Sequence, residues 1–338
     1  MQVDGGIYTG NFVKDRRCGQ GKYVSSNGDS YSGMWKDDRF DGEGEYRSVV
    51  GDIHRGAWTE GLRSGYGVAE YADGARYEGH WQGDSRHGDG IFHYDDGGAT
   101  YVGQWVKGKR EGKGVNGWSS GDVYEGEWKD NVKHGRGVYS YANGNVYDGE
   151  YAEDERCGWG VLTCGQVEVY GGEWRKDVKH GYGEVTGLDG SGYKGNYKYG
   201  YRHGTGILRY ASGEEYSGEW HTDQMHGKGS FKFANGDLFE GRFDRDKRAG
   251  WGKMTYSDGG SFYGEYLADK RTGRGAMHYS NGDCYDGEWL GDEKHGRGIM
   301  TYADGSVYDG DWVRGCRMGE GVLKVKVRGR GLWYSVCM

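Results

Sequence analysis

The stretch that decides the fold of this chain is YEGEWKDNVKHGRGVYSYANG, residues 124–144. In its first half, aromatic residues and glycine alternate with charged residues. The first set is Tyr124, Gly126 and Trp128, and the second set is Glu125, Glu127 and Lys129. A further alternating run follows, with Gly135, Gly137 and Tyr139 on one side. An alternation of period two is typical of β-strands, so the stretch predicts two strands with one aromatic face and one charged face.

Polar residues connect the two predicted strands. Residues 130–133 lie between the runs and predict a hairpin loop. Asn143-Gly144 closes the stretch, and Asn-Gly readily adopts the positive φ of a tight turn. The stretch therefore predicts a β-hairpin followed by a turn into the next unit.

This unit recurs along the whole chain. Its aromatic-x-Gly-x-aromatic step occurs fourteen times at intervals of 23 residues, except for one interval that is one residue longer. The steps begin at Tyr8, Tyr31, His54, Tyr77, Tyr101, Tyr124, Tyr147, Tyr170, Tyr193, Tyr216, Phe239, Phe262, Tyr285 and Tyr308. Such a period indicates stacked units that contact only their neighbours. We therefore predict one repeat array over residues 8–330, with an N-terminal cap at 1–7 and a C-terminal cap at 331–338.

Charged residues suggest which positions face each other. Four repeats carry a glutamate nine residues before a basic residue: Glu127 with Arg136, Glu219 with Lys228, Glu265 with Arg274, and Glu288 with Arg297. Opposite charges are favoured across an antiparallel pair. That register places Trp128 opposite Gly135, Gly126 opposite Gly137, and Tyr124 opposite Tyr139. Large rings would then cover bare backbone on the neighbouring strand.

The predicted core of the repeats follows from this register. Its representatives are Tyr124, Gly126, Trp128, Gly135, Gly137, Tyr139, Tyr216, Gly218, Trp220, Tyr285, Gly287 and Trp289. The chain has no proline, which fits continuous β-ladders, and its 30 Tyr and 13 Trp supply much of the surface that can be buried. The predicted fold class is all-β: an elongated, twisted, single-layer antiparallel sheet of fourteen stacked hairpins. At about 4.8 Å per strand, such an array would span on the order of 130 Å.

Composition narrows the classes of partner. The net charge of −8 argues against nucleic acid as the main partner and disfavours a membrane-surface role for the whole chain. The six cysteines form no C-x-x-C pair, and the N-terminus MQVDGG carries no apolar signal segment. These features predict a reduced, cytoplasmic protein.

The three repeat marks resemble those of a known family. Tyr124-x-Gly-x-Trp128, His134-Gly-x-Gly137 and Asn143-Gly144, at a step of 23 residues, resemble the MORN (membrane occupation and recognition nexus) repeat. The resemblance covers essentially the whole chain. It implies a β-hairpin per repeat, a groove-shaped sheet, and non-enzymatic roles as a scaffold or adaptor. Members built only of repeats resemble cytoskeletal parts, such as cortical and basal-ring scaffolds and ciliary radial-spoke heads, and the family name records a proposed membrane association.

Some units depart from the pattern. Val167 stands where other units carry the turn glycine, and one residue is inserted near Gly97-Gly98. We expect a bulge or local bend at each of these places.

Residues suited to catalysis or metal binding recur without forming a singular cluster. Six histidines share one repeat position: His87, His134, His180, His203, His226 and His295. Neighbouring units would place them about 10 Å apart, too far to share a zinc ion with bonds of about 2.1 Å. Residues 112–117 match G-x-G-x-x-G, but a strand rather than a helix is expected to follow. We predict no catalytic, cofactor-binding or metal site, and a structural role for the six histidines.

Two charged features break the symmetry of the array. An acid follows the leading aromatic by three residues in seven of the last nine units: Glu127, Glu150, Glu173, Glu219, Glu265, Glu288 and Asp311. These acids either pair across strands or form a stripe for a basic partner. Basic residues gather in the last unit: Arg314, Arg317, Lys324, Lys326, Arg328 and Arg330. The alternation in this unit predicts a terminal strand, whose open edge either joins another chain, as in a homodimer, or is protected from doing so by its lysines.

The functional hypothesis is a non-enzymatic cytoskeletal scaffold that binds other cytoskeletal or ciliary proteins. The pattern favours the ciliary axoneme or radial spoke over a cortical or basal-body structure. The alternative is a membrane-recruitment module that meets anionic phospholipid through the basic last unit.

Overall fold

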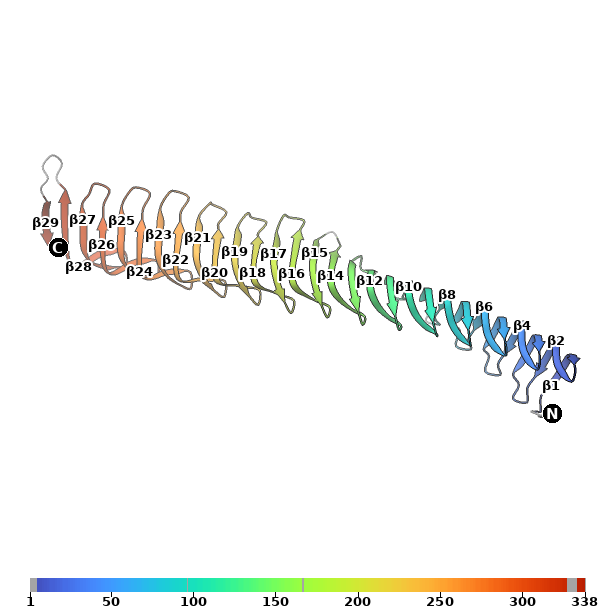
Figure 1. Cartoon of the computed structure of the whole chain (residues 1–338). Coiled ribbons are helices and arrows are strands. Elements are labelled where there is room, and N and C mark those ends of the chain that lie inside the picture. The colour runs from blue at the N-terminus through green and yellow to red at the C-terminus, as the bar shows by residue number, and fades with distance from the viewer. Residues whose placement is uncertain (1–4, 96, 166, 327–332, 338) are drawn as a thin grey trace. The chain divides into compact units, whose positions relative to one another are not determined.

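The structure is a computed structural model that describes residues 5–95, 97–165, 167–326 and 333–337. The described residues form strands and turns without any helix, and the strands belong to one antiparallel sheet. Within each of the two units described below, a hairpin lies beside the hairpin that follows it in the sequence (Figure 1). The predicted fold class of stacked β-hairpins in a single-layer antiparallel sheet is confirmed.

The chain divides into two compact units. The first comprises Met1–Gln166 with Trp174–Asp177, and the second comprises Val167–Glu173 with Val178–Met338. The strands up to the division are β1 (Ile7–Val13), β2 (Arg16–Val24), β3 (Ser30–Lys36), β4 (Arg39–Arg47), β5 (Ile53–Thr59), β6 (Leu62–Glu70), β7 (Arg76–Gln82), β8 (Ser85–His93), β9 (Thr100–Val106), β10 (Lys109–Gly117), β11 (Val123–Lys129), β12 (Val132–Ser140), β13 (Val146–Ala152), β14 (Glu155–Cys164) and β15 (Glu168–Arg175). The remaining strands are β16 (Val178–Gly187), β17 (Gly192–Lys198), β18 (Tyr201–Arg209), β19 (Glu215–His221), β20 (Gln224–Lys232), β21 (Leu238–Asp244), β22 (Lys247–Thr255), β23 (Ser261–Leu267), β24 (Lys270–His278), β25 (Cys284–Leu290), β26 (Glu293–Thr301), β27 (Val307–Val313), β28 (Cys316–Lys326) and β29 (Trp333–Cys337).

The register within a hairpin agrees with the prediction only near the turn into the next unit. In the β11–β12 hairpin, Tyr124 lies opposite Tyr139 and Gly126 lies opposite Gly137, as predicted. The predicted pairing of Trp128 with Gly135 is wrong, because the register shifts after Gly126 and Trp128 lies opposite Lys133. Gly135 has a φ of 58° and is the residue at which the strand bulges.

Similar bulges recur in other hairpins, at the Gly-x-Gly position, where the sequence did not predict them. Because of the bulge, Trp128 faces Gly112 of the preceding hairpin, and Gly135 faces Tyr151 of the next. The first glycine of Gly-x-Gly therefore adopts the positive φ of the bulge, and the second leaves room for the tyrosine ring.

The predicted charge pairs within a hairpin are also wrong. Glu127 lies opposite His134, and its carboxylate accepts a 3.3 Å hydrogen bond from the backbone N–H of Arg136. Arg136 itself faces Glu150 of the next hairpin, as Arg274 faces Glu288. The facing charges are thus fourteen residues apart rather than nine.

The acids that follow the leading aromatics have a recurrent structural role. Their carboxylates bond the backbone N–H between the two glycines of Gly-x-Gly, inside the bulge. These bonds run from Trp159 to Glu150, from Tyr182 to Glu173, from Lys228 to Glu219 and from Arg274 to Glu265, at 2.9–3.3 Å. Asp311 instead lies 3.5 Å from the guanidinium of Arg297, measured from Oδ1 to Nη1.

The leading tyrosine covers the glycine pair, as the packing argument predicts. A Cβ atom on Gly137 would lie 2.5 Å from Cζ of Tyr124, and a Cβ on Gly126 would lie 2.6 Å from the same atom. The Tyr124 hydroxyl donates a 3.0 Å hydrogen bond to the carbonyl of Glu127. Tyr124 is fully buried, although the sheet has a single layer.

Rings of successive repeats form a continuous edge-to-face ladder. The Tyr124 ring lies 5.2 Å from the Trp128 ring and 5.3 Å from the Tyr151 ring of the next repeat. The Trp128 indole N–H donates a 3.1 Å hydrogen bond to the carbonyl of Gly114 in the preceding repeat. Each fully buried ring contributes at most ~4–6 kcal/mol. The ladder therefore connects each hairpin to its neighbour as well as bridging the strands of the hairpin itself.

The other predicted core residues behave alike. Tyr216, Trp220, Tyr285 and Trp289 are all buried. Gly218 and Gly287 lie beneath the hydroxyls of Tyr216 and Tyr285. Tyr139 is half-buried, and burial is the main cause that raises its pKa to about 12.

Hairpin loops of successive repeats are joined by an arginine and an acid. The Arg202 backbone N–H donates a 2.8 Å hydrogen bond to Asp223, and its guanidinium donates a 2.9 Å hydrogen bond to the Asp223 carbonyl. The same guanidinium lies 4.3 Å from the centre of the Trp220 ring. Asp223 has a φ of 65°, which aspartate and asparagine tolerate better than other side chains.

We expect Asp223→Ala to lower the free energy of unfolding by about 1–2 kcal/mol, because it removes the acceptor and leaves a strained φ. Asp223→Asn should cost less than about 0.5 kcal/mol, since Asn131 accepts from Arg110 at the equivalent position at 2.8 Å. Urea denaturation of both variants checks this. Equal costs would show that the side-chain acceptor does not matter.

Candidate binding cleft on the aromatic face

The side of the sheet that carries Tyr124, Trp128 and their equivalents is here called the aromatic face. In most repeats two further large side chains belong to this face, one on the second strand of the hairpin and one just after it. In the sixth repeat these are Tyr139 and Tyr141, whose ring centres are 4.5 Å apart. In the second and third repeats this cover is incomplete. Ser48 stands at the position of Tyr141, and Ala69 stands at the position of Tyr139.

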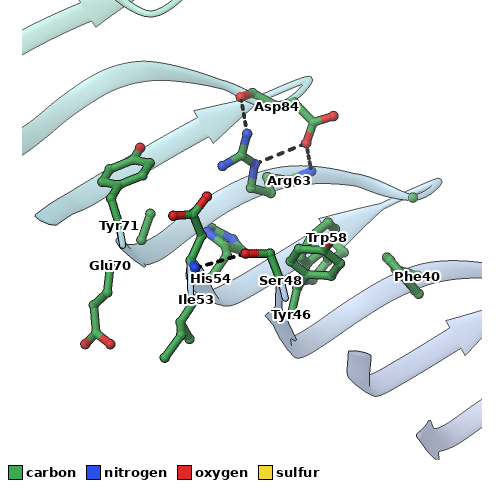
Figure 2. Close-up of a pocket in the computed structure, with 13 residues that line it drawn as sticks. Phe40, Tyr46, Ser48, Ile53, His54, Trp58, Arg63, Glu70, Tyr71 and Asp84 are labelled. Atoms are coloured by element: carbon green, nitrogen blue, oxygen red, sulfur yellow. Dashed lines mark hydrogen bonds and ion pairs between the residues drawn. The ribbon is translucent and has the colours of Figure 1, made fainter. Parts of the chain in front are cut away.

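The incomplete cover leaves a cleft of about 450 Å³ around His54, called the His54 cleft below (Figure 2). Its walls include Phe40, Tyr46, Trp58 and Tyr71. Tyr46, His54 and Ala69 are directly opposite one another on β4, β5 and β6. The cleft therefore opens over one row of cross-strand neighbours.

An ion pair borders the His54 cleft. Arg63 Nε lies 3.2 Å from Asp84 Oδ1, and Arg63 also donates a 3.0 Å hydrogen bond to the Asp84 carbonyl (Figure 2). The Arg63 guanidinium lies 4.2 Å from the centre of the Trp81 ring. Phe40 occupies the position that Arg63 holds in its own repeat, and it stacks on Tyr31 at 3.7 Å. One side of the cleft is thus charged and the other is aromatic.

His54 replaces the leading tyrosine of its repeat. It is 3% exposed, and its ring lies 5.2 Å from Trp58 and 5.0 Å from Trp81. Neither ring nitrogen has a hydrogen-bond partner among the described residues. In repeats with tyrosine the hydroxyl reaches the carbonyl three residues on, as from Tyr77 to His80 at 2.9 Å.

Burial lowers the pKa of His54 from its usual 6.5 to about 4. The unfolded chain therefore takes up this proton more readily than the folded chain, and stability is lost as the pH falls from 6.5 towards 4. We expect His54→Phe to remove ~2 kcal/mol of this loss between pH 7 and pH 4.5, less than the full shift because pH 4.5 still lies above the pKa of His54 in the folded chain. Urea denaturation of both proteins at pH 7 and pH 4.5 measures the difference. Identical pH dependence would contradict the buried, neutral imidazole.

A second cleft lies in the unit that contains β17 and β18. It has a volume of about 720 Å³ and is lined by Tyr193, Tyr197, Leu208 and Tyr210, among others. Its border again carries an arginine and aspartate pair, Arg202 and Asp223, at 3.1 Å between Nε and Oδ1. Both units therefore present hollows on the aromatic face.

The structure gives the basic residues of the last repeat different surroundings. Arg314 is exposed in the loop after β27, and Lys324 is exposed on β28. Arg317 lies 4.8 Å from the Tyr308 ring and bonds the Tyr302 hydroxyl, so it packs against the aromatic face. The Lys326 side chain, Arg328 and Arg330 lie outside the described residues.

The expected terminal strand is not the last one. Residues 316–326 form β28, which pairs with β27 on one side and with β29 on the other. The edge predicted for this basic segment is thus covered by Trp333–Cys337, a segment predicted as a cap without a repeat. This strand carries no repeat mark, so the periodicity did not predict it.

Among the described residues, no group of three or more histidine, cysteine or acidic side chains is arranged to hold a metal ion. His203 and His221 have ring centres 5.2 Å apart, and His221 and His226 have ring centres 5.8 Å apart. No helix of the described part is long and apolar enough to cross a membrane.

Sequence reasoning missed the His54 cleft. His54 was visible as a departure from tyrosine, but Phe40 on β4, Ser48 directly after β4 and Ala69 on β6 carry no motif. The signal that could have found the cleft is the loss of aromatic residues at neighbouring repeat positions.

A family model described as MORN repeat matches the chain fourteen times. The matched residues are 8–30, 31–53, 54–76, 77–99, 101–123, 124–146, 147–166, 170–192, 193–215, 216–238, 239–261, 262–284, 285–307 and 308–324. A comparison with curated proteins gave no match.

Several solved structures are similar at low identity. One is the SAS-4 (dCPAP) TCP domain in complex with a proline-rich motif of Ana2 from Drosophila melanogaster, at 13% identity, with 46% of this chain and 83% of that chain covered and a TM-score of 0.28. Another is the TCP10 domain of Danio rerio CPAP in complex with a STIL peptide, at 12% identity, with coverage of 80% and 96% and a TM-score of 0.24. A streptogramin B lyase matches at 12% identity, with coverage of 94% and 98% and a TM-score of 0.14.

Proposed function

The chain belongs to the MORN repeat family, and from this premise we propose that it is a non-enzymatic cytoskeletal scaffold that binds partner proteins along its aromatic face. Its proposed location is the cytoplasm, in the ciliary axoneme or radial spoke rather than in a cortical or basal-body structure. The cytoskeletal assignment rests on the resemblance to family members that consist only of repeats.

The observation that carries protein binding is the presence of open, aromatic-walled hollows on the aromatic face. The His54 cleft and the cleft beside Tyr197 are each bordered by an arginine and aspartate pair. Aromatic walls with a few polar groups at the border are typical of sites that hold side chains of a partner. The repeated acids favour binding on the aromatic face over binding along an acidic stripe, because their carboxylates accept hydrogen bonds from backbone N–H groups in the bulges of the sheet.

Affinity purification after mild cross-linking tests the scaffold. Cells expressing the tagged full-length chain should yield axonemal or other cytoskeletal proteins cross-linked to residues of the aromatic face. The matched control is a cross-linking site on the charged face, such as Glu125 replaced by a photoreactive residue. Cross-links spread equally over both faces, or an absence of cytoskeletal proteins, would contradict the proposal.

The second candidate function is recruitment to anionic membranes through the last repeat. The exposure of Arg314 and Lys324 favours it. Flotation with phosphoinositide vesicles separates the two functions, because a scaffold should stay in solution whereas a recruitment module floats and is released by salt.

Self-association through the C-terminal repeat is part of the proposal as well. Deleting residues 308–338 exposes β26 and should reduce the mass measured by light scattering beyond the loss of the deleted residues if copies pair there. A mass that falls only by that of the deleted residues would exclude pairing through this end.

A further inference from the structure

Three histidines and one aspartate form a row near the hairpin loops of the ninth to eleventh repeats. In order, they are His203, His221, His226 and Asp244. The ring centres of His203 and His221 are 5.2 Å apart, and those of His221 and His226 are 5.8 Å apart. Nδ1 of His226 then lies 3.5 Å from Oδ1 of Asp244. The whole row belongs to the second compact unit.

Pairing between neighbouring repeats brings these side chains together. Gly204 on β18 lies opposite Trp220 on β19. His203 precedes Gly204 and His221 follows Trp220, so the antiparallel strands place the two histidines beside each other. The same relation recurs one repeat later, between β20 and β21. The row is therefore built by the sheet and not by a local motif.

The second imidazole at this place is a departure from the repeat. Four other histidines share the repeat position of His203, but the position that would lie beside them is held by a poor metal ligand. These pairs are His87 with Val106, His134 with Ala152, His180 with Lys198, and His295 with Val313. Only His203 has a histidine at the neighbouring position, namely His221. The sequence thus places two imidazoles together once in the array.

The separation of the two rings fits a shared metal ion. Histidines at the same repeat position are two strands apart, about 10 Å, and cannot bind one ion. His221 belongs to a different position and lies between His203 and His226. With a metal–nitrogen bond of about 2.1 Å, two imidazoles at a tetrahedral angle have ring centres about 5.2 Å apart. The His203 and His221 rings have this separation.

Both rings are accessible to an ion in solution. His221 is exposed at the end of β19, and His203 is partly exposed on β18. The Thr222 hydroxyl lies 3.4 Å from Nδ1 of His221, which leaves Nε2 of that ring for a metal. His226 is farther from His221 and has Asp244 beside its Nδ1, so it fits less well as the second ligand.

We propose that His203 and His221 together bind one divalent transition-metal ion of the zinc class, with water in the remaining coordination positions. Imidazole nitrogen suits Zn²⁺, Cu²⁺ and Ni²⁺, whereas Mg²⁺ and Ca²⁺ prefer oxygen ligands. The site goes beyond the proposed scaffold function and does not depend on it.

Titration of the metal-free, full-length chain with Zn²⁺ tests the site by NMR of the histidine imidazole protons. The two sets of signals are assigned by their loss in His203→Asn and in His221→Asn. Zn²⁺ should shift both sets, whereas Mg²⁺ should shift neither. Each variant should bind Zn²⁺ at least about tenfold more weakly, since loss of an outer partner alone costs about 10–100-fold.

Unchanged Zn²⁺ affinity in both variants would overturn the proposal. The same holds if neither set of signals shifts when Zn²⁺ is in excess over the six cysteines, which are the other soft ligands of the chain. Circular dichroism checks that each variant is folded, and the exposure of His221 makes its replacement the safer of the two.

Two further variants locate the site within the row. His295→Asn is the matched control, because His295 has the repeat position of His203 but Val313 at the neighbouring position, and it should leave the affinity unchanged. His226→Asn should retain Zn²⁺ binding as well. Loss of binding in His226→Asn but not in His203→Asn would overturn the pairing of His203 with His221.

Discussion

Replacing Gly137 by alanine is expected to lower the free energy of unfolding by about 3 kcal/mol, although it adds a single methyl group. The new Cβ atom would lie 2.5 Å from Cζ of Tyr124, well inside van der Waals contact. The Tyr124 ring cannot move aside easily, because it is fully buried between Trp128 and Tyr151. Urea denaturation followed by circular dichroism measures the loss.

Gly117→Ala is the matched control for this substitution. Gly117 also lies in a strand of the same unit, but a Cβ atom there meets only the Thr100 hydroxyl, at 3.7 Å. Its cost should stay within about 0.5 kcal/mol. A double variant with Tyr124→Ala should show strong coupling, because the clash vanishes with the ring. Equal costs for Gly117→Ala and Gly137→Ala would contradict ring-over-backbone packing.

Replacing Trp128 by alanine is expected to cost about 3–5 kcal/mol. The substitution empties a site between the Tyr124 ring and the Tyr101 ring of the preceding repeat, which lies 5.5 Å away. It also leaves the Gly114 carbonyl without its 3.1 Å indole hydrogen bond. The damage should be greatest in the repeats around residues 101–151, because each repeat contacts only its neighbours. Native-state hydrogen exchange of those strands reports it.

Trp159→Ala provides the control with the same change of side chain. Trp159 lies between the two glycines of Gly158-x-Gly160 and is 47% exposed. Its removal should cost less than the removal of Trp128, since about half of the Trp159 surface is already exposed in the folded chain. If both tryptophan variants lose similar stability, the interlocking ladder is not the main source of cohesion between repeats.

Most of the fold could be predicted from the repeat alone. The alternation of Tyr124, Gly126 and Trp128 with charged residues indicates strands and distinguishes the two faces, and the burial of Tyr124 and Trp128 confirms it. The pairing of Gly126 with Gly137 was also predictable. It lies on the side of the bulge that faces the turn into the next unit, where the register is not shifted.

The bulge could not be derived from spacing. An interval of nine residues between Glu127 and Arg136 fits a pair within one hairpin, whereas Arg136 faces Glu150 of the next hairpin. Strand residues have neighbours on both sides, and a periodic sequence does not say which neighbour a charge meets. The positive φ of Gly135 decides this by shifting the register.

By itself, the sequence determined the hairpin unit, its number of copies and the aromatic face, because a period of two within a period of 23 has one consistent solution in stacked strands. Only the tertiary structure decided the bulged register and the His54 cleft. Phe40, Ser48, His54 and Ala69 each look like a tolerated local exchange along the chain. They make a cavity because cross-strand pairing places His54 opposite Ala69 and the sheet brings Phe40 and Ser48 to the same hollow, and that proximity is set by hydrogen bonds between strands rather than by order in the sequence.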